Sequence, residues 1–346
     1  MEFQTLGKTG ISVSRSCLGA MMFGAMGNRD HNDCISMIHK ALDSGVNFID
    51  TADAYSGGES EEIVGAALKD RRDRVVLATK FFIPMGEDPN MKGGSRKWII
   101  EEVENSLRRL GTDYIDLYQI HRWDDATDIE ETLSALTDLV RQGKVRAIGS
   151  SMFPGDRIVE SQWAAEKMGF QRFRCEQPWY SIFSRDIERT VLPVCERYGM
   201  GVIVWSPLDG GWLTGRYRSP SDLGDKTRLA RSAARFGRKF DPESELHHRK
   251  FQLVEELSKI AADAGLSLAH LALGFAREHP AVTSVIIGPR THEQLDDCLA
   301  ASDIVLSKET LEAIDALVPP GTSVNGIDPS AQVVLGRRVR RRLRSA

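Results

Sequence analysis

The chain has 346 residues, of which 41% are hydrophobic and 27% charged, so it can bury a sizeable core. Its net charge is −4, no apolar run approaches the length of a membrane span, and its start lacks the basic and apolar segments of a signal peptide. With five scattered cysteines and no CxxC pair, these features predict a cytoplasmic protein with reduced thiols, no membrane contact and no metal site.

Apolar, β-rich runs follow one another along most of the chain. They are nearly continuous in apolar residues rather than alternating, as strands buried on both faces should be. The runs cover residues 16–20, 46–50, 75–80, 114–121, 145–150, 173–177, 201–206 and 283–288.

Helix-period apolar faces lie between most of these runs, at residues 35–42, 63–68, 99–110 and 129–140. Glycines that would stop three of the helices stand at Gly45, Gly111 and Gly143. Eight strands alternating with helices predict an α/β fold, a (β/α)8 TIM barrel that forms a single domain over residues 1–320.

Three segments fall outside this rhythm. Residues 3–13 are typical of a β-hairpin, which we expect to cap the bottom of the barrel. Residues 216–248 form a long polar connection, and a loop of this length favours a cover over the cofactor or substrate. Residues 321–346 form a C-terminal extension that ends in an arginine-rich tail; we interpret the tail as a solvated terminus and expect no nucleic-acid partner.

Ionisable residues stand where three successive strand runs end. Asp50, Lys80 and His121 each close a run, and Tyr55 lies in the loop just past the first. The C-terminal strand ends of a parallel barrel converge on one face, where catalytic groups gather. Each residue alone is more often packing or solvated rim, but the four together predict a catalytic site.

The four side chains suit the delivery of a proton to a carbonyl oxygen. Tyrosine is a weak acid, with a reference pKa of about 10. A charged Lys80 nearby would stabilise the phenolate of Tyr55, and we expect this attraction to lower the pKa of Tyr55 despite desolvation. Asp50 would keep Lys80 charged and oriented, while His121 would donate to the carbonyl oxygen.

No GxGxxG motif joins a strand to a helix, so a Rossmann fingerprint is absent from the sequence. Residues 205–216 instead form a glycine-rich stretch after the seventh strand run, a common place for phosphate sites in barrels. Its backbone amides, with Ser206 and Arg216, would hold a pyrophosphate, and Trp205 would stack on a nicotinamide. The alternative is a core tryptophan followed by a simple turn.

The motifs around the four residues resemble the signature of the aldo-keto reductases. Residues 45–55, followed by Gly58-Glu59-Ser60-Glu61, carry the aspartate and tyrosine motif, and residues 78–80 and 121–124 match the lysine and histidine motifs. The likeness spans about residues 3–317 and is closest to the bacterial and potassium-channel-β-like branch. It implies Tyr55 as the general acid/base, Lys80 and Asp50 as its tuning pair, and His121 as the orienting residue.

The resemblance also implies a nicotinamide cofactor and the residues that hold it. Gln177 would contact the carboxamide, and Arg290 would pair with a 2′-phosphate, which favours NADP (NADPH) over NAD. The complete set of expected cofactor-binding residues is Gly19, Met21, Asp50, Ser150, Ser151, Gln177, Trp205, Ser206, Leu208, Gly210, Leu213, Gly215, Arg216, Gly288, Arg290, Gln294 and Asp297.

Two positions depart from the family pattern. Met152 follows Ser150 and Ser151 where the family usually has Ser-Asn, and methionine cannot replace the hydrogen bonds of asparagine. Cys298 stands where an asparagine commonly contacts the adenine. Both substitutions weaken individual contacts to the cofactor and leave the cofactor prediction in place.

The sequence therefore predicts an NADPH-dependent oxidoreductase that reduces an aldehyde, ketone or sugar-type carbonyl to an alcohol. The alternative is a nucleotide-sensing regulatory subunit, similar to the channel-β proteins, that binds NADPH and turns over little. The expected partner is a small carbonyl compound, and the sequence leaves both its identity and the oligomeric state open.

Overall fold

The computed structural model describes residues 1–224, 230 and 241–326, and the chain forms two compact units. The barrel unit comprises Met1–Pro178, Thr190–Trp205 and Pro280–Asp303. The second unit comprises Trp179–Arg189, Ser206–His279 and Ile304–Ala346. Each unit is described by itself below.

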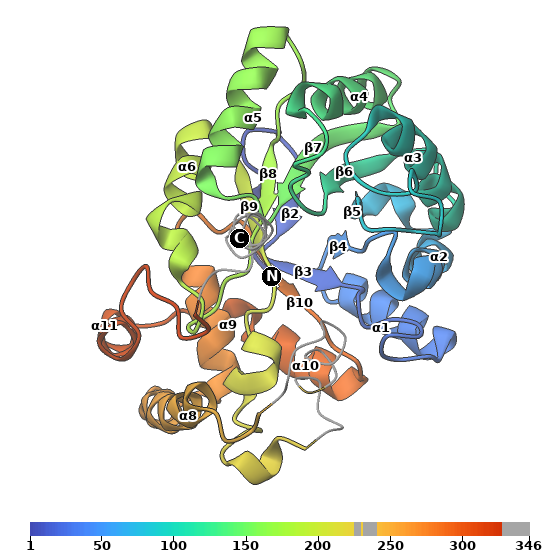
Figure 1. Ribbon diagram of the computed structural model, residues 1–346. Helices are drawn as coiled ribbons and strands as arrows, with labels where there is room; N and C mark the ends of the chain where they lie inside the picture. Colours follow the sequence, from blue (N-terminus) through green and yellow to red (C-terminus); the bar gives the residue numbers. More distant parts are fainter. Residues whose placement is uncertain (225–229, 231–240, 327–346) are drawn as a thin grey trace. The chain divides into compact units, whose positions relative to one another are not determined.

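The barrel unit contains a closed barrel of parallel strands in the order β10-β3-β4-β5-β6-β7-β8-β9 (Figure 1). All eight strand runs of the sequence are strands of this barrel, which confirms the predicted (β/α)8 fold. The strands are β3 (Ser16–Gly19), β4 (Phe48–Asp50), β5 (Val76–Phe81), β6 (Ile115–Ile120), β7 (Val145–Ser151), β8 (Cys175–Gln177), β9 (Gly201–Val204) and β10 (Ser284–Ile287).

Helices surround these strands in the barrel unit (Figure 1). Helix α3 shows how the sequence sets their limits: Ser95 accepts from the backbone N–H of Trp98 at its start, and Gly111 ends it with φ 63°. The helices are α1 (His31–Asp43), η1 (Tyr55–Gly58), α2 (Glu59–Leu68), η2 (Arg72–Arg74), α3 (Arg96–Leu110), α4 (Ile129–Arg141), α5 (Gly155–Met168), α6 (Val191–Tyr198), α10 (His292–Ala300) and η6 (Ala301–Asp303).

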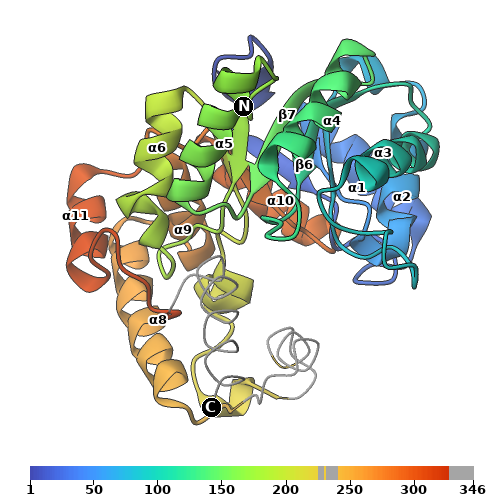
Figure 2. The same ribbon diagram turned by 45° about the horizontal axis from the view of Figure 1, so that its top comes forward.

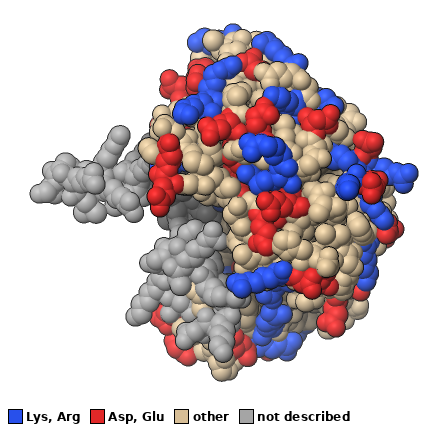
Figure 3. All heavy atoms as spheres, turned by 90° about the vertical axis from the view of Figure 1, so that its right-hand side faces the viewer, with Lys and Arg blue, Asp and Glu red and all other residues tan. Residues whose placement is uncertain are grey.

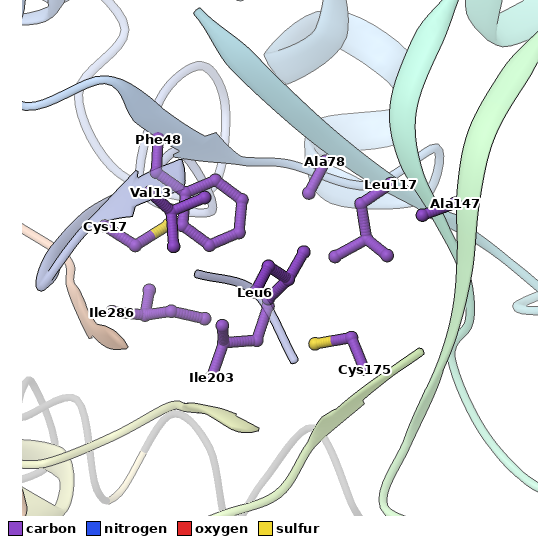
Figure 4. Close-up of a cluster of buried hydrophobic side chains, with 10 residues drawn as sticks. All are labelled: Leu6, Val13, Cys17, Phe48, Ala78, Leu117, Ala147, Cys175, Ile203 and Ile286. Carbon is purple, nitrogen blue, oxygen red and sulfur yellow. The ribbon is translucent and has the colours of Figure 1, made fainter. Parts of the chain in front are cut away.

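The N-terminal hairpin pairs β1 (Phe3–Thr5) with β2 (Ser12–Ser14) and closes the bottom of the barrel, as predicted. Its turn approaches the start of β9 so closely that a Cβ on Gly7, where φ is 54°, would lie 2.5 Å from the backbone N of Gly201. Figure 4 shows Leu6 of the hairpin among the side chains that fill the barrel. The hairpin therefore completes the core from below and leaves the opposite, C-terminal strand ends for chemistry.

The second unit is mainly helical. Helix α8 packs against α9 and α11, and Figure 2 shows α11 beside α8. Residues 321–326 join this unit through the backbone N–H of Val324, which donates to the carbonyl of Phe183 at 2.9 Å. Its elements are η3 (Asp186–Arg189), η4 (Asp209–Thr214), η5 (Pro220–Asp222), α8 (Glu245–Asp263), α9 (Leu268–Glu278) and α11 (Lys308–Leu317).

Two of the sequence predictions fall wholly or partly beyond the described residues. The predicted covering loop, residues 216–248, is described only at 216–224, 230 and 241–248, and the arginine-rich tail lies entirely outside the described part. Within the part of the chain that the structure describes, every helix is too short or too polar to cross a membrane.

Candidate active site

The structure brings the ionisable residues of three strand ends together around one ammonium group. Lys80 Nζ donates to Asp50 Oδ1 at 2.5 Å, to the carbonyl of Thr51 at 2.8 Å and to Tyr55 Oη at 3.2 Å. The ring of His121 meets that of Tyr55 edge-on, with 5.8 Å between the centroids. Lys80 is fully buried, so its three donors are used entirely on this cluster.

The loop that carries Tyr55 is held in an unusual backbone conformation. Ser56, Gly57 and Gly58 follow one another in the left-handed region, with φ of 53°, 71° and 103°. The hydroxyl of Ser56 donates to the carbonyl of Phe23 at 2.9 Å and accepts from the backbone N–H of Met26 at 3.0 Å. These bonds fix the turn and offset the strain that a non-glycine residue carries there.

Two side-chain amides donate hydrogen bonds to the second carboxylate oxygen of Asp50. Its second oxygen, Oδ2, accepts from Gln119 Nε2 at 3.2 Å and from Gln177 Nε2 at 2.8 Å. The sequence analysis missed Gln119, although it stands two residues before His121, and residues two apart on a strand share a face. Gln177, which we expected to bind a cofactor amide, is thus also part of the Asp50 network.

Burial and neighbouring charges set the protonation of this cluster. Burial opposes the charge on Lys80, but Asp50 and Tyr55 together raise the pKa of Lys80 above its ordinary value. Burial also raises the pKa of Tyr55 by more than Lys80 lowers it. The expected direction for Tyr55 was therefore wrong, because only the folded structure reveals how completely protein surrounds the phenol.

His121 is a neutral imidazole. Burial, with the positive charges of Arg122 and Lys80, lowers the pKa of His121 well below its ordinary value. Its Nδ1 is buried and has no hydrogen-bond partner among the described residues. A neutral ring still has one N–H to donate, so His121 is suited to hold a carbonyl oxygen next to Tyr55.

The end of β7 carries Ser150 and Ser151, two of the residues expected to bind the cofactor. Ser150 Oγ donates to Glu176 Oε2 at 2.5 Å, and Ser151 Oγ donates to the carbonyl of Gln177 at 2.9 Å. Both hydroxyls keep lone pairs for a further donor. Met152 follows them with φ 58°, a conformation that asparagine tolerates better than methionine.

Glu176, beside Gln177 on β8, is a buried carboxyl that the sequence analysis did not single out. Besides Ser150, it accepts from the backbone N–H of Phe153 at 3.1 Å. Burial raises its pKa to about 8, because these hydrogen bonds do not fully replace the lost water. Glu176 is therefore mainly protonated at neutral pH.

The segment after β10 carries the residues expected at the phosphate end of the cofactor. A Cβ added to the exposed Gly288 would meet no atom within 4 Å, so this position is open. The Arg290 side chain makes no hydrogen bond or ion pair with the described residues, and its backbone N–H donates to Gln294 Oε1 at 2.9 Å. Cys298 is buried, and burial raises its pKa to about 12.

In the second unit, the glycine-rich segment is built on a strained turn. Ser206, Asp209, Gly210, Gly211 and Gly215 all have positive φ. Asp209 is buried and binds Lys250 Nζ at 2.9 Å through one oxygen and Asn325 Nδ2 at 2.7 Å through the other. The segment therefore has a defined conformation of its own.

Among the described residues no cluster of three or more His, Cys, Asp or Glu side chains is arranged to hold a metal ion.

A closed (β/α)8 barrel with a tyrosine, a buried lysine–aspartate pair and a neutral histidine at its C-terminal strand ends has the architecture of a barrel enzyme. The sequence profile of the Aldo/keto reductase family matches residues 16–319, and the chain belongs to this family. This agrees with the resemblance carried by its motifs.

Relatives cover nearly the whole chain. It is 40% identical to the uncharacterized oxidoreductase YrpG of Bacillus subtilis over 93% of this chain and 97% of that protein. It is 35% identical to a probable voltage-gated potassium channel subunit beta of Oryza sativa, over 92% and 97%. It is also 35% identical to norsolorinic acid reductase of Aspergillus flavus, over 90% and 79%. The family and the oxidoreductases among its relatives show that the chain is an oxidoreductase of the carbonyl-reducing type.

Proposed function

We propose that the protein reduces the carbonyl of an aldehyde, ketone or sugar-type compound to an alcohol with NADPH, Tyr55 being the proton donor. The observation that carries the proposal is the 3.2 Å contact between Tyr55 Oη and Lys80 Nζ, with Asp50 bound to the same ammonium group. Members of this family act on small carbonyl compounds and generally use nicotinamide cofactors. We further propose that the protein works in the cytoplasm.

The raised pKa of Tyr55 suits a proton donor. Burial keeps the phenol protonated at neutral pH, so the proton is present when a substrate binds. When the proton moves to the carbonyl oxygen, the new phenolate gains the attraction of Lys80, about 4 kcal/mol at ~4 Å and an effective dielectric of ~20. This attraction is larger for the phenolate than for the phenol, and a positioned acid of this kind gives about 10²- to 10⁴-fold in rate.

His121 and the Asp50 network provide orientation. The neutral ring of His121 donates to the carbonyl oxygen from beside Tyr55, so the oxygen faces the phenol. Gln119 and Gln177 hold Asp50, which in turn fixes the position of Lys80. Orientation of this quality contributes to the rate separately from the acid.

The residues present fit a nicotinamide dinucleotide. The carboxamide would bind Ser150 and Ser151, whose hydroxyls keep free lone pairs, and the open position at Gly288 leaves room near Arg290 for a phosphate. Within the second unit, the expected contacts are those of residues 206–216. When bound, the nicotinamide would supply the hydride. Arg290, with its guanidinium unpaired among the described residues, would hold the 2′-phosphate that distinguishes NADPH.

The substitution Tyr55→Phe tests the proposal. We expect loss of carbonyl reduction, followed by NADPH absorbance, with cofactor affinity nearly unchanged in a fluorescence titration. The matched control is Tyr198→Phe, which removes a phenol from α6 and should retain activity. Reduction at the wild-type rate by the Tyr55→Phe protein would show that another group supplies the proton.

A regulatory role is the second candidate, because two of the similar plant proteins are named probable potassium channel beta subunits. On this proposal the chain would bind NADPH tightly and oxidise it slowly. Multiple-turnover assays on a panel of aldehydes, ketones and sugars distinguish the two. Turnover with any substrate at ordinary enzymatic rates favours the reductase, whereas tight NADPH binding without turnover favours the sensor.

A further inference from the structure

Arg122 places a positive charge at the candidate active site that the reaction described above does not use. It directly follows His121 after β6, and its Nη1 donates to the carbonyl of His121 at 2.5 Å. The half-buried guanidinium lies within electrostatic range of Tyr55, His121 and Glu176. It is therefore beside the groups that would receive the substrate.

Arg122 has no acidic partner among the described residues, unlike Arg109 and Arg185, two other partly or largely buried arginines. Arg109 binds Glu61 and Glu102 at 2.6 and 2.5 Å, and Arg185 likewise binds two carboxylates. Within the described ranges, Arg122 forms no salt bridge, and its hydrogen bonding is limited to the carbonyl of its neighbour. On the face of the molecule shown in Figure 3, Lys and Arg are interspersed with Asp and Glu.

The nearby carboxyl does not supply the missing charge. Glu176 is buried and bound to Ser150, and the burial that raises its pKa to about 8 keeps it neutral at neutral pH. A guanidinium withdrawn from water without a counter-ion is costly. The cost is relieved when an anion enters the site, so the arrangement favours a ligand that brings its own negative charge.

We propose that Arg122 binds an oxyanion on the substrate, so that the preferred substrates are aldehydes or ketones bearing a carboxylate or phosphate close to the carbonyl. The inference rests on the proposed carbonyl reduction. The inference adds the substrate class to that proposed function. A guanidinium presents paired N–H donors that match the oxygens of either anion. Because Arg122 adjoins His121, which would hold the carbonyl oxygen, the anion lies only a few bonds from the reacting carbon.

Matched substrate pairs test the proposal. The carboxylate pair is 4-carboxybenzaldehyde and its methyl ester, and the phosphate pair is glyceraldehyde 3-phosphate and glyceraldehyde. We expect wild-type kcat/KM to favour the anionic member of at least one pair by about tenfold or more, the equivalent of about 1.4 kcal/mol. Preference in only one pair identifies which anion the site takes.

The variants assign the preference to Arg122. Arg122→Gln should reduce the anionic-to-neutral ratio of kcat/KM to about one, and Arg122→Lys should restore part of it. Arg157→Gln is the control, because Arg157 binds Glu160 at 2.5 Å and lies over the Trp123 ring rather than beside Tyr55. It should keep the wild-type ratio. Equal wild-type rates within both pairs, or a preference that survives in Arg122→Gln, would overturn the inference.

A binding measurement separates this inference from the proposed reaction. Calorimetric titration with 4-(hydroxymethyl)benzoate and its methyl ester, in the presence of NADPH, needs no turnover. Tighter binding of the carboxylate by the wild type but not by Arg122→Gln supports the anion site even if no carbonyl is reduced. Equal binding of both alcohols by both proteins counts against it, even if neutral aldehydes are reduced rapidly.

Discussion

Both units of the chain hold a buried lysine–aspartate pair, but the two pairs have different surroundings. Lys80 lies 2.5 Å from Asp50 in the barrel unit, and Lys250 lies 2.9 Å from Asp209 in the second unit. All four side chains are at most 6% exposed. The ion pairs are thus alike in length and burial, so their roles must differ through what else each lysine touches.

The third group at each pair decides its role. Lys80 also donates to Tyr55 Oη, a group whose charge changes when it gives up a proton. Lys250 lies over the rings of Trp212 and Phe183, 5.1 and 5.5 Å from their centroids, and these rings cannot ionise. A buried ion pair next to a phenol can stabilise a transition state, whereas the same pair among apolar rings holds a backbone turn.

Replacing each lysine by methionine should produce the largest difference between the two ion pairs. Removing one partner of a buried pair costs about 3–5 kcal/mol of stability in either unit. Lys80→Met should in addition lower kcat by about 10²- to 10⁴-fold, because the phenolate of Tyr55 loses its counter-charge. Lys250→Met should act mainly on the affinity for NADPH, because Asp209 belongs to the glycine-rich segment.

Denaturant titrations, steady-state kinetics and NADPH fluorescence measure these three effects separately. The double variant Asp50→Asn with Lys80→Met is the control, since it removes the unpaired charge, and it should recover stability without activity. A fall in kcat for Lys250→Met as large as that for Lys80→Met would contradict the division of roles.

Glu176 sharpens the comparison because it is a buried carboxyl with no lysine bound to it. Burial raises its pKa from 4.5 to about 8, so between these pH values the folded protein holds a proton that the unfolded chain releases. Its contribution to stability is therefore complete below about pH 4.5 and is lost as pH rises through about 8.

The substitution Glu176→Gln should remove this pH dependence. The amide imitates the protonated acid, accepting from Phe153 and donating to Ser150 Oγ, and the relative gain in stability should approach about 5 kcal/mol above pH 8. Chemical denaturation from pH 5 to pH 9 measures it. The groups around Glu176 whose own ionisation must be considered are Arg122, Cys175 and Cys195. A constant difference between the two proteins across this range would show that Glu176 is ionised throughout.

Arg290 provides a smaller effect, confined to the barrel unit. Its guanidinium has no partner among the described residues, so Arg290→Ala should leave stability nearly unchanged. Loss of a charge-assisted contact to the 2′-phosphate should weaken NADPH binding by about 1.5–3 kcal/mol and NADH binding far less. Fluorescence titrations with both cofactors measure the ratio. Equal weakening of the two would remove the basis for assigning a 2′-phosphate to Arg290.

The strand ends made part of the candidate active site predictable. Asp50, Lys80 and His121 each close an apolar run, and parallel strands in a barrel end on the same face. Gln119 escaped notice because a neutral amide inside a strand resembles an ordinary core residue. The sequence analysis also missed Arg122 and Glu176. The proposed role of Arg122 depends on its lack of a salt bridge, and the raised pKa of Glu176 depends on burial, and neither property is visible in a sequence.

The pKa of Tyr55 illustrates the same limit. Spacing along the chain indicated that Lys80 would approach the phenol, and the structure confirms the contact at 3.2 Å. The balance between that attraction and desolvation depends on every atom packed around the ring. Motif spacing therefore predicts which groups meet, while the direction of the resulting pKa shift requires the packed structure.

The smallest expected effect concerns backbone strain, which both units carry at residues other than glycine that have a positive φ. Met152 after Ser151 has φ 58°, and Ser206, at the start of the glycine-rich segment, has φ 60°. In the left-handed region a residue other than glycine or asparagine costs about 1 kcal/mol. Met152→Asn should relieve this strain, although it also gives up the burial of a side chain that is only 5% exposed.

We therefore expect a modest loss of stability for Met152→Asn, because the lost burial outweighs the relieved strain, but a gain in cofactor affinity. Its amide would add a hydrogen bond to the carboxamide, about 1 kcal/mol or roughly fivefold in the dissociation constant for NADPH. Met152→Leu is the matched control, because it keeps an apolar side chain and adds no amide. If both variants bind NADPH as the wild type does, the turn after β7 does not contact the carboxamide. Tighter binding by the asparagine variant alone would mean that methionine at this position weakens a contact whose backbone geometry is already in place.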